Sequence, residues 1–206
     1  MVKFLADQDM KPATFIAPSS IFGLVVLFCG NPLWADSPLG LFETHTDIGK
    51  PAHGGAVEYN GERKTYLVSG GGKNMWGQED GFHFVWKRMS GDVALTASIR
   101  WPNNGKEPHR KACLLIRQSL DADSAYVDAA FHGDGLTSLQ YRPARGERTY
   151  EIQSNATRPA RIRIDKQGDR FFMSVAPEGQ PLRHAGGSFK PADLVTLVNV
   201  PLPLLR

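Results

Sequence analysis

Side chains of contrasting chemistry alternate along one short stretch of the sequence, SAYVDAAFHGDG at residues 124–135. If this stretch is a β-strand, Tyr126, Asp128 and His132 share one face and apolar side chains occupy the other. Such a face could be a catalytic group, a surface that binds sugar, or the solvated side of a sandwich. Residues that are four apart on a strand are separated by about 13 Å, so Asp128 and His132 do not meet as a catalytic pair. They can form a row of polar groups.

Polar residues on the neighbouring strands would widen this row into a polar sheet face. Arg117 belongs to the preceding apolar run, and Gln140 and Arg142 belong to the following one. If that face is concave, these residues could hydrogen-bond many hydroxyl groups, with Tyr126 as a stacking platform. If it is convex, it is merely solvated. The predicted orientation is outward for all of them, and also for Lys111.

Trp76 lies in a glycine-rich loop, GGGKNMWGQ, and has two equally good interpretations. An exposed indole offers the area and the fixed plane on which the apolar face of a sugar stacks. A buried indole would plug the end of a sandwich instead. The predicted ligand-binding residues are therefore Trp76, Arg117, Tyr126, Asp128, His132, Gln140 and Arg142.

Catalytic motifs are missing from the sequence. A retaining glycosidase needs two carboxyl groups about 5 Å apart, and jelly-roll glucanases carry them on one strand as Glu-x-Asp-x-x-Glu, which does not occur here. Glu79 and Asp80 are adjacent, so on a strand they would point to opposite faces. We interpret them as part of a turn and predict no catalytic residue.

Metal and cofactor motifs are also missing. Asp121, Asp123 and Asp128 lack the further ligands and the glycine of an EF-hand loop. The histidines show no HxH or HExxH spacing, so zinc is weakly supported. The GGGK run at 70–73 lacks the spacing of a phosphate-binding loop. We predict no metal site and no cofactor.

Strand-like runs with turn residues between them dominate the rest of the chain, and no long helix is indicated. They recur about every 10 residues, which is typical of an all-β sandwich or jelly roll. Phe84, Leu114, Val127, Ile164 and Phe172 are among the side chains expected to face inward. The runs lie at 64–70, 82–88, 93–101, 111–119, 124–132, 136–142, 149–154, 160–165 and 170–176.

The N-terminal segment predicts export. The uncharged apolar run at 21–29 has the length of a signal peptide and is too short to span a bilayer. Lys3 and Lys11 precede it, and cleavage after Ala35 would leave a chain that is secreted or periplasmic, with no stable membrane span. We interpret residues 1–35 as a signal peptide; a buried strand or a short membrane anchor is the alternative.

Charge and cysteine content narrow the function classes further. The net charge of +3 comes from interspersed acidic and basic residues, which argues against a nucleic-acid partner. Cleavage would remove Cys29 and leave Cys113 without a disulfide partner. Because Cys113 lies in an apolar run, we expect a buried inert thiol rather than a nucleophile.

Long runs in the middle of the chain resemble a bacterial group. LFETHTDIG, GGGKNMWGQEDGFHFVWKRMSGDVALTASI, HRKACLLIRQSLDADSAYVDAAFHGDGLTSLQYR and EIQSNATRPARIRI are similar to exported concanavalin A-like domains, close to an uncharacterised family labelled DUF1349. The resemblance implies a jelly-roll sandwich of the laminin-G and glucanase superfamily and covers roughly residues 40–190. It also implies a possible association with TolB-like β-propeller proteins, beside which such domains are often found.

The C-terminal segment departs from this family. Its members continue with a glycine-rich strand and a closing strand, whereas this chain ends in PADLVTLVNVPLPLLR. Prolines are poorly tolerated in a central strand. We therefore assign residues 36–190 to the sandwich, without its last strands, and 191–206 to an atypical tail. We interpret this tail as truncated or out of frame; a natural edge of the sheet is the alternative.

Three functions are consistent with these observations. The first is an exported, non-catalytic module that binds a carbohydrate or glycan through the polar face. The second is a glycoside hydrolase or lyase with His132 or Asp128 as acid/base, although the missing carboxylate motif counts against an enzyme. The third is an interaction module for a TolB-like propeller protein, with no small ligand.

Overall fold

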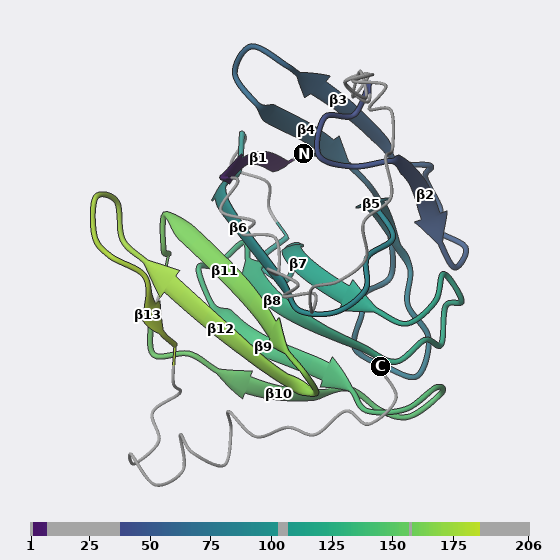
Figure 1. Ribbon diagram of the computed structural model, residues 1–206. Helices are drawn as coiled ribbons and strands as arrows, with labels where there is room; N and C mark the ends of the chain where they lie inside the picture. Colours follow the sequence, from purple (N-terminus) through teal and green to yellow (C-terminus); the bar gives the residue numbers. More distant parts are fainter. Residues whose placement is uncertain (1, 8–37, 103–106, 157, 186–206) are drawn as a thin grey trace, which may run out of the picture.

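The computed structural model describes residues 2–7, 38–102, 107–156 and 158–185 and shows an all-β sandwich of antiparallel sheets (Figure 1). The predicted fold class is thus confirmed. Each strand-like run contains a strand close to its expected bounds. Within the described residues, no helix is long and apolar enough to cross a membrane.

The strands belong to separate hydrogen-bonded sheets. The seven-stranded sheet has the order β13-β12-β11-β6-β1-β4-β3 and contains β1 (Val2–Asp7), β3 (Ala56–Asn60), β4 (Thr65–Ser69), β6 (Val93–Arg100), β11 (Arg161–Gln167), β12 (Arg170–Ala176) and β13 (Arg183–His184). The four-stranded sheet has the order β10-β9-β8-β7 and contains β7 (Lys111–Arg117), β8 (Tyr126–His132), β9 (Thr137–Arg142) and β10 (Tyr150–Gln153). A two-stranded sheet pairs β2 (Thr44–Ile48) with β5 (Phe82–Trp86).

The main core lies between the seven-stranded and four-stranded sheets. Leu114, Val127 and Leu139 project into it from the four-stranded sheet, and Ile162 and Ile164 project from β11. All of them except Leu114 have polar neighbours on both sides along the strand, as sequence periodicity predicts for a sheet with one apolar face. Burial of such a residue contributes about 1.5–3 kcal/mol to the free energy of folding.

One strand has the opposite orientation from the predicted one. We expected Phe172 to face the core, but Phe171, Met173 and Val175 belong to the core, and Phe172 is only half-buried. The pairing of β12 with β11 explains the difference, because Met173 is opposite Ile164 and Val175 is opposite Ile162. When a strand has apolar residues on both faces, its pairing with the neighbouring strand decides which face is buried.

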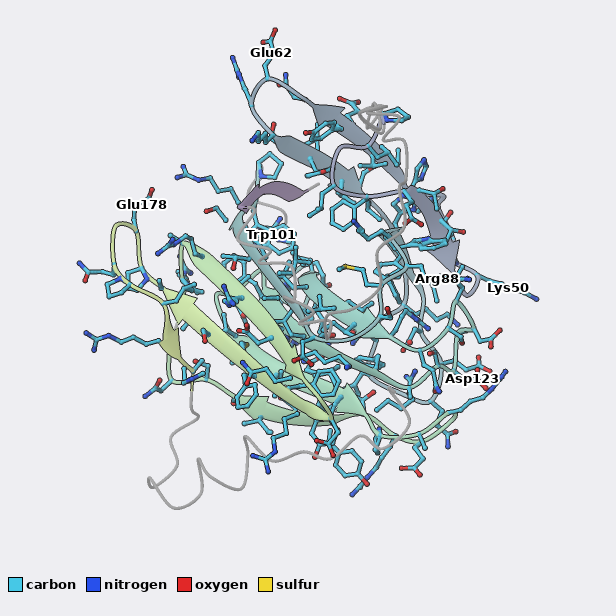
Figure 2. The ribbon with its side chains drawn as sticks, in the orientation of Figure 1. Lys50, Glu62, Arg88, Trp101, Asp123 and Glu178 are labelled. Carbon is cyan, nitrogen blue, oxygen red and sulfur yellow. The ribbon has the colours of Figure 1, made fainter. Side chains whose placement is uncertain are left out.

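Two loops and the N-terminal strand contribute none of the core residues named above. Glu62 lies at the tip of the β3–β4 hairpin and Glu178 in the loop that follows β12 (Figure 2). β1 falls inside the segment predicted to be a signal peptide and pairs with β4 and β6. The apolar run at 21–29, the cleavage position and the tail at 191–206 lie outside the described residues, so the signal peptide and the atypical tail stay predictions.

Candidate functional site

The outer face of the four-stranded sheet carries the predicted polar row, but that row is buried. Tyr126, Asp128, Gln140 and Arg142 are 0% exposed and His132 is 4% exposed. These side chains point away from the core as predicted, but a merely solvated face, one of the two interpretations from the sequence, is excluded for these five residues. The grouping on one face is as expected, because Asp128 is opposite Gln140 and Tyr126 is opposite Arg142 across the β8–β9 pair.

The glycine-rich loop between β4 and β5 covers one end of this face. The Arg142 guanidinium donates to both oxygens of Asp80 at 2.6 and 2.9 Å, and to the carbonyl oxygens of Gly77 at 2.8 Å and Ser124 at 3.0 Å. Its Nε donates to the carbonyl of Glu147 at 3.0 Å. This bidentate ion pair is fully buried and fixes the end of the loop against β9.

Two further candidates are also used to anchor this loop. The Tyr126 hydroxyl donates to the Met75 carbonyl at 2.6 Å and lies 3.0 Å from the Thr149 hydroxyl. Arg117 lies 3.5 Å from Asp80 and donates to the carbonyl of Ser119 at 2.6 Å. Because these side chains are at most 2% exposed, we assign Arg117, Tyr126 and Arg142 to loop anchoring and not to ligand contact. Asp80, which the sequence placed in an ordinary turn, is the counter-charge of both arginines.

The other end of the face contains a connected group of polar side chains. Lys111 Nζ donates to Gln140 Oε1 at 3.1 Å, and Gln140 Nε2 lies 2.8 Å from Glu151 Oε1 and 3.4 Å from His132 Nε2. Lys111 Nζ also lies 5.4 Å from the centre of the Trp76 ring, within the range of a cation–π contact. We call Trp76, Lys111, His132, Gln140 and Glu151 the polar group.

Trp76 is the exposed member of the polar group. Its side chain is 46% exposed, so it does not plug the end of the sandwich. Lys111 and Glu151 are half-buried, and the exposed Gln153 donates to Glu151 Oε2 at 3.0 Å. The exposed ring of His109 lies 6.4 Å from that of His132. The group therefore extends from a solvent-facing indole to buried hydrogen-bonding side chains.

Asp128 lies within the same face and has unusual surroundings. Among the described residues neither of its carboxyl oxygens has a conventional hydrogen-bond partner, and the Nδ1 atom of His132 lacks one too. Burial raises the pKa of Asp128 to about 8, although the nearby Lys111 ammonium and Cys113 thiol lower it. Burial also lowers the pKa of His132, and the Lys111 charge adds to that effect. Both groups are consequently held largely uncharged near neutral pH.

Cys113 is half-buried in β7, and burial together with the Asp128 charge raises the pKa of its thiol well above the usual value. A thiol with a raised pKa is a poor nucleophile, which agrees with the inert role predicted for it.

Asp121 and Asp123 form exposed ion pairs with Arg145 at 3.2 and 2.9 Å. They lie in the loop before β8, with Asp123 at the edge of the molecule (Figure 2). Their carboxylates are thus held by Arg145 and are not grouped with Asp128.

A cavity of about 1180 Å³ is lined by residues of β5, β6 and β7 and of the loop at 70–75. Of the polar group, Lys111 contributes to its lining. Trp76, His132, Gln140 and Glu151 are not among the residues that line it. We therefore treat the cavity separately from the candidate site.

Fold and site together define the class of protein: an all-β sandwich whose second sheet carries a buried polar face beside an exposed indole. Comparisons of the chain with protein-family models, with curated proteins and with solved structures find no match. The resemblance to concanavalin A-like domains consequently stays a prediction from the sequence.

Sequence reasoning missed Lys111 and Glu151 as members of the group. Lys111 is outward on β7 by parity, which was a usable signal, but its reach across β8 to Gln140 on β9 depends on the sheet. Glu151 pairs directly with Gln140 across the β9–β10 ladder. Only the strand order brings these residues to one place.

Proposed function

We propose that this protein is an exported, non-catalytic module of the concanavalin A-like jelly-roll type, which binds a carbohydrate or glycan. The observation that carries the proposal is the position of the Trp76 indole beside Lys111 in the polar group. An exposed aromatic ring next to ordered hydrogen-bonding side chains suits a ligand with an apolar face and a hydroxyl-rich edge.

The internal hydrogen bonds of the polar group support preorganisation. Lys111, Gln140 and Glu151 are linked by bonds of 2.8–3.1 Å, so their side chains lose little further freedom when a ligand binds. Preorganisation of this kind improves affinity because the ordering cost is met during folding. In this proposal Trp76 stacks on the sugar ring, and Lys111, Glu151 and Gln153 offer hydrogen bonds at the accessible rim.

The enzyme alternative has one supporting observation. A carboxyl with a pKa of about 8 remains protonated near neutral pH and suits a general acid. Asp128 is nevertheless fully buried, and in this structure it lies out of reach of a substrate. We therefore favour binding without turnover.

The test is glycan-array retention of the folded protein. We expect Trp76→Ala to lower retention at least tenfold without changing the thermal melt, because its side chain is exposed. Leu120→Ala is the matched control, since Leu120 is similarly exposed at 43% and lies outside the polar group. Hydrolysis of an arrayed glycan would overturn the non-catalytic role. A cooperative melt without retention would overturn glycan binding and favour the interaction module for a propeller protein.

A further inference from the structure

A second cluster of titratable side chains lies on the β2–β5 pair, away from the polar group. Asp47 on β2 is directly opposite His83 on β5, and His45 is on the same face of β2 two residues earlier. These residues are far apart in the sequence, and antiparallel pairing alone brings them together. Across such a pair, opposite and diagonal side chains are within contact distance.

The His83 ring is held in one orientation. Its Nδ1 lies 2.8 Å from Asp47 Oδ1, and its side chain is only 3% exposed. The Gly55 amide donates to the Asp47 carboxylate at 3.1 and 3.3 Å, which positions the carboxylate in turn. Because a carboxylate oxygen accepts this hydrogen bond, the His83 proton belongs on Nδ1.

Two glycines leave room for this ring. A Cβ atom at Gly55 would overlap the His83 ring, and a Cβ atom at Gly70 would approach His83 Cβ within 2.7 Å. Backbone segments before β3 and after β4 therefore close around the buried side of the imidazole. The His45 side chain lies on the open side and is exposed.

The second ring nitrogen of His83, Nε2, lies close to Nδ1 of His45. With the proton on Nδ1, the His83 Nε2 atom presents a lone pair, and it lies 3.1 Å from His45 Nδ1. Metal–imidazole bonds measure about 2.0–2.1 Å. If one ion bound both nitrogens at this separation, the nitrogen–metal–nitrogen angle would be about 100°. This angle falls between the values for octahedral and tetrahedral coordination.

We propose that His45 and His83 bind a divalent transition-metal ion such as Cu²⁺, Ni²⁺ or Zn²⁺, with Asp47 orienting His83. A carboxylate that accepts the second imidazole N–H is the usual partner of a metal-binding histidine, because it fixes the tautomer and makes the ligand nitrogen more basic. Imidazole ligands favour these ions, with Cu²⁺ bound most tightly.

The proposed site is open. Among the described residues, no group of three or more His, Cys, Asp or Glu side chains is arranged to hold an ion. Water or an added ligand completes the coordination on the exposed side of His45. None of these residues belongs to the polar group, so metal binding can be tested independently of glycan binding.

The experiment is a Cu²⁺ titration of the full chain without an affinity tag, followed by calorimetry and by electron paramagnetic resonance. We expect one saturable site with hyperfine splitting from imidazole nitrogens. His45→Gln should lower the affinity at least tenfold, and because His45 is exposed the fold should be kept. Asp47→Asn should lower it about 10–100-fold, the usual effect of removing the carboxylate behind a ligating histidine.

His184→Gln is the control, because His184 is an exposed histidine on a different sheet. Its Cu²⁺ affinity and its spectrum should match those of the unchanged protein. Absence of saturable binding, or equal affinity of the unchanged protein and His45→Gln, would overturn the proposal and leave His45 and His83 as a simple hydrogen-bonded pair. An equal loss in His184→Gln would overturn it as well.

Discussion

Replacement of Arg142 by methionine should be the most destabilising change at the polar face. Every guanidinium nitrogen of Arg142 has an acceptor, and the side chains of Arg142 and its partner Asp80 are both 0% exposed. Methionine would fill most of the volume but would leave the Asp80 carboxylate buried, with Arg117 at 3.5 Å as its remaining cationic neighbour. Removal of one partner from a buried pair typically costs about 3–5 kcal/mol, because an uncompensated charge stays in the interior.

This cost would be visible in both equilibrium and thermal unfolding. For a chain of this size, about 3–5 kcal/mol corresponds to a fall in the melting temperature of roughly 6–20 °C. Urea unfolding gives the free energy directly. Trp76 lies on the loop that the pair anchors, so glycan retention should fall as well, even though Arg142 does not contact the ligand in our proposal.

Arg145→Met is the matched control. Arg145 also forms ion pairs with aspartates, but its side chain is 66% exposed, so solvent screens these pairs and they contribute little to stability. The reasoning would be refuted if Arg142→Met and Arg145→Met lowered the unfolding free energy by similar amounts below about 1 kcal/mol. An Asp80→Asn, Arg142→Met double-mutant cycle would then measure how strongly the two residues are coupled.

Other changes test neighbouring parts of the structure. The raised pKa of Asp128 means that the folded state holds a proton that the unfolded state releases between about pH 4 and pH 8. Stability should therefore fall with rising pH in this window, by up to about 1.4 kcal/mol per pH unit, and Asp128→Asn should remove this dependence; urea midpoints that shift equally with pH in both proteins would contradict this. Gly72→Ala should destabilise the loop, because a Cβ there would collide with the Gly81 carbonyl; Gly77→Ala, with open space at that position, is its control in thermal melts. Trp76→Ala should change the free energy of unfolding by less than about 0.5 kcal/mol, as is usual for exposed positions, and a larger loss in urea titrations would mean that the indole supports the fold.

Alternation along the strands made much of the architecture predictable. The apolar parity of β7, β8, β9 and β11 placed Leu114, Val127, Leu139 and Ile164 in the core correctly, since a strand with one polar face has only one way to bury the other. The rule did not apply to β12, because the run FFM at 171–173 places apolar side chains on both faces of the strand. Parity also says which residues share a face, but it does not say what covers that face.

The candidate site shows the same division. Sequence periodicity grouped Tyr126, Asp128 and His132 correctly, but it could not show that the loop carrying Asp80 closes over the Arg142 end. That closure depends on a pairing between residues 62 positions apart. The His45–His83 contact was missed for a similar reason, since a search for local spacing cannot find ligands that lie on different strands.

The sequence by itself determined an all-β chain, the positions of most strands and the division of each strand into polar and apolar faces, because these follow from local turn chemistry and a period of two. Tertiary structure alone decided which polar residues are buried, which are used to anchor a loop and which remain open to solvent. These outcomes depend on sheet order and on the path of the loops, since charge compensation and close approach are properties of residues brought together only by the folded chain.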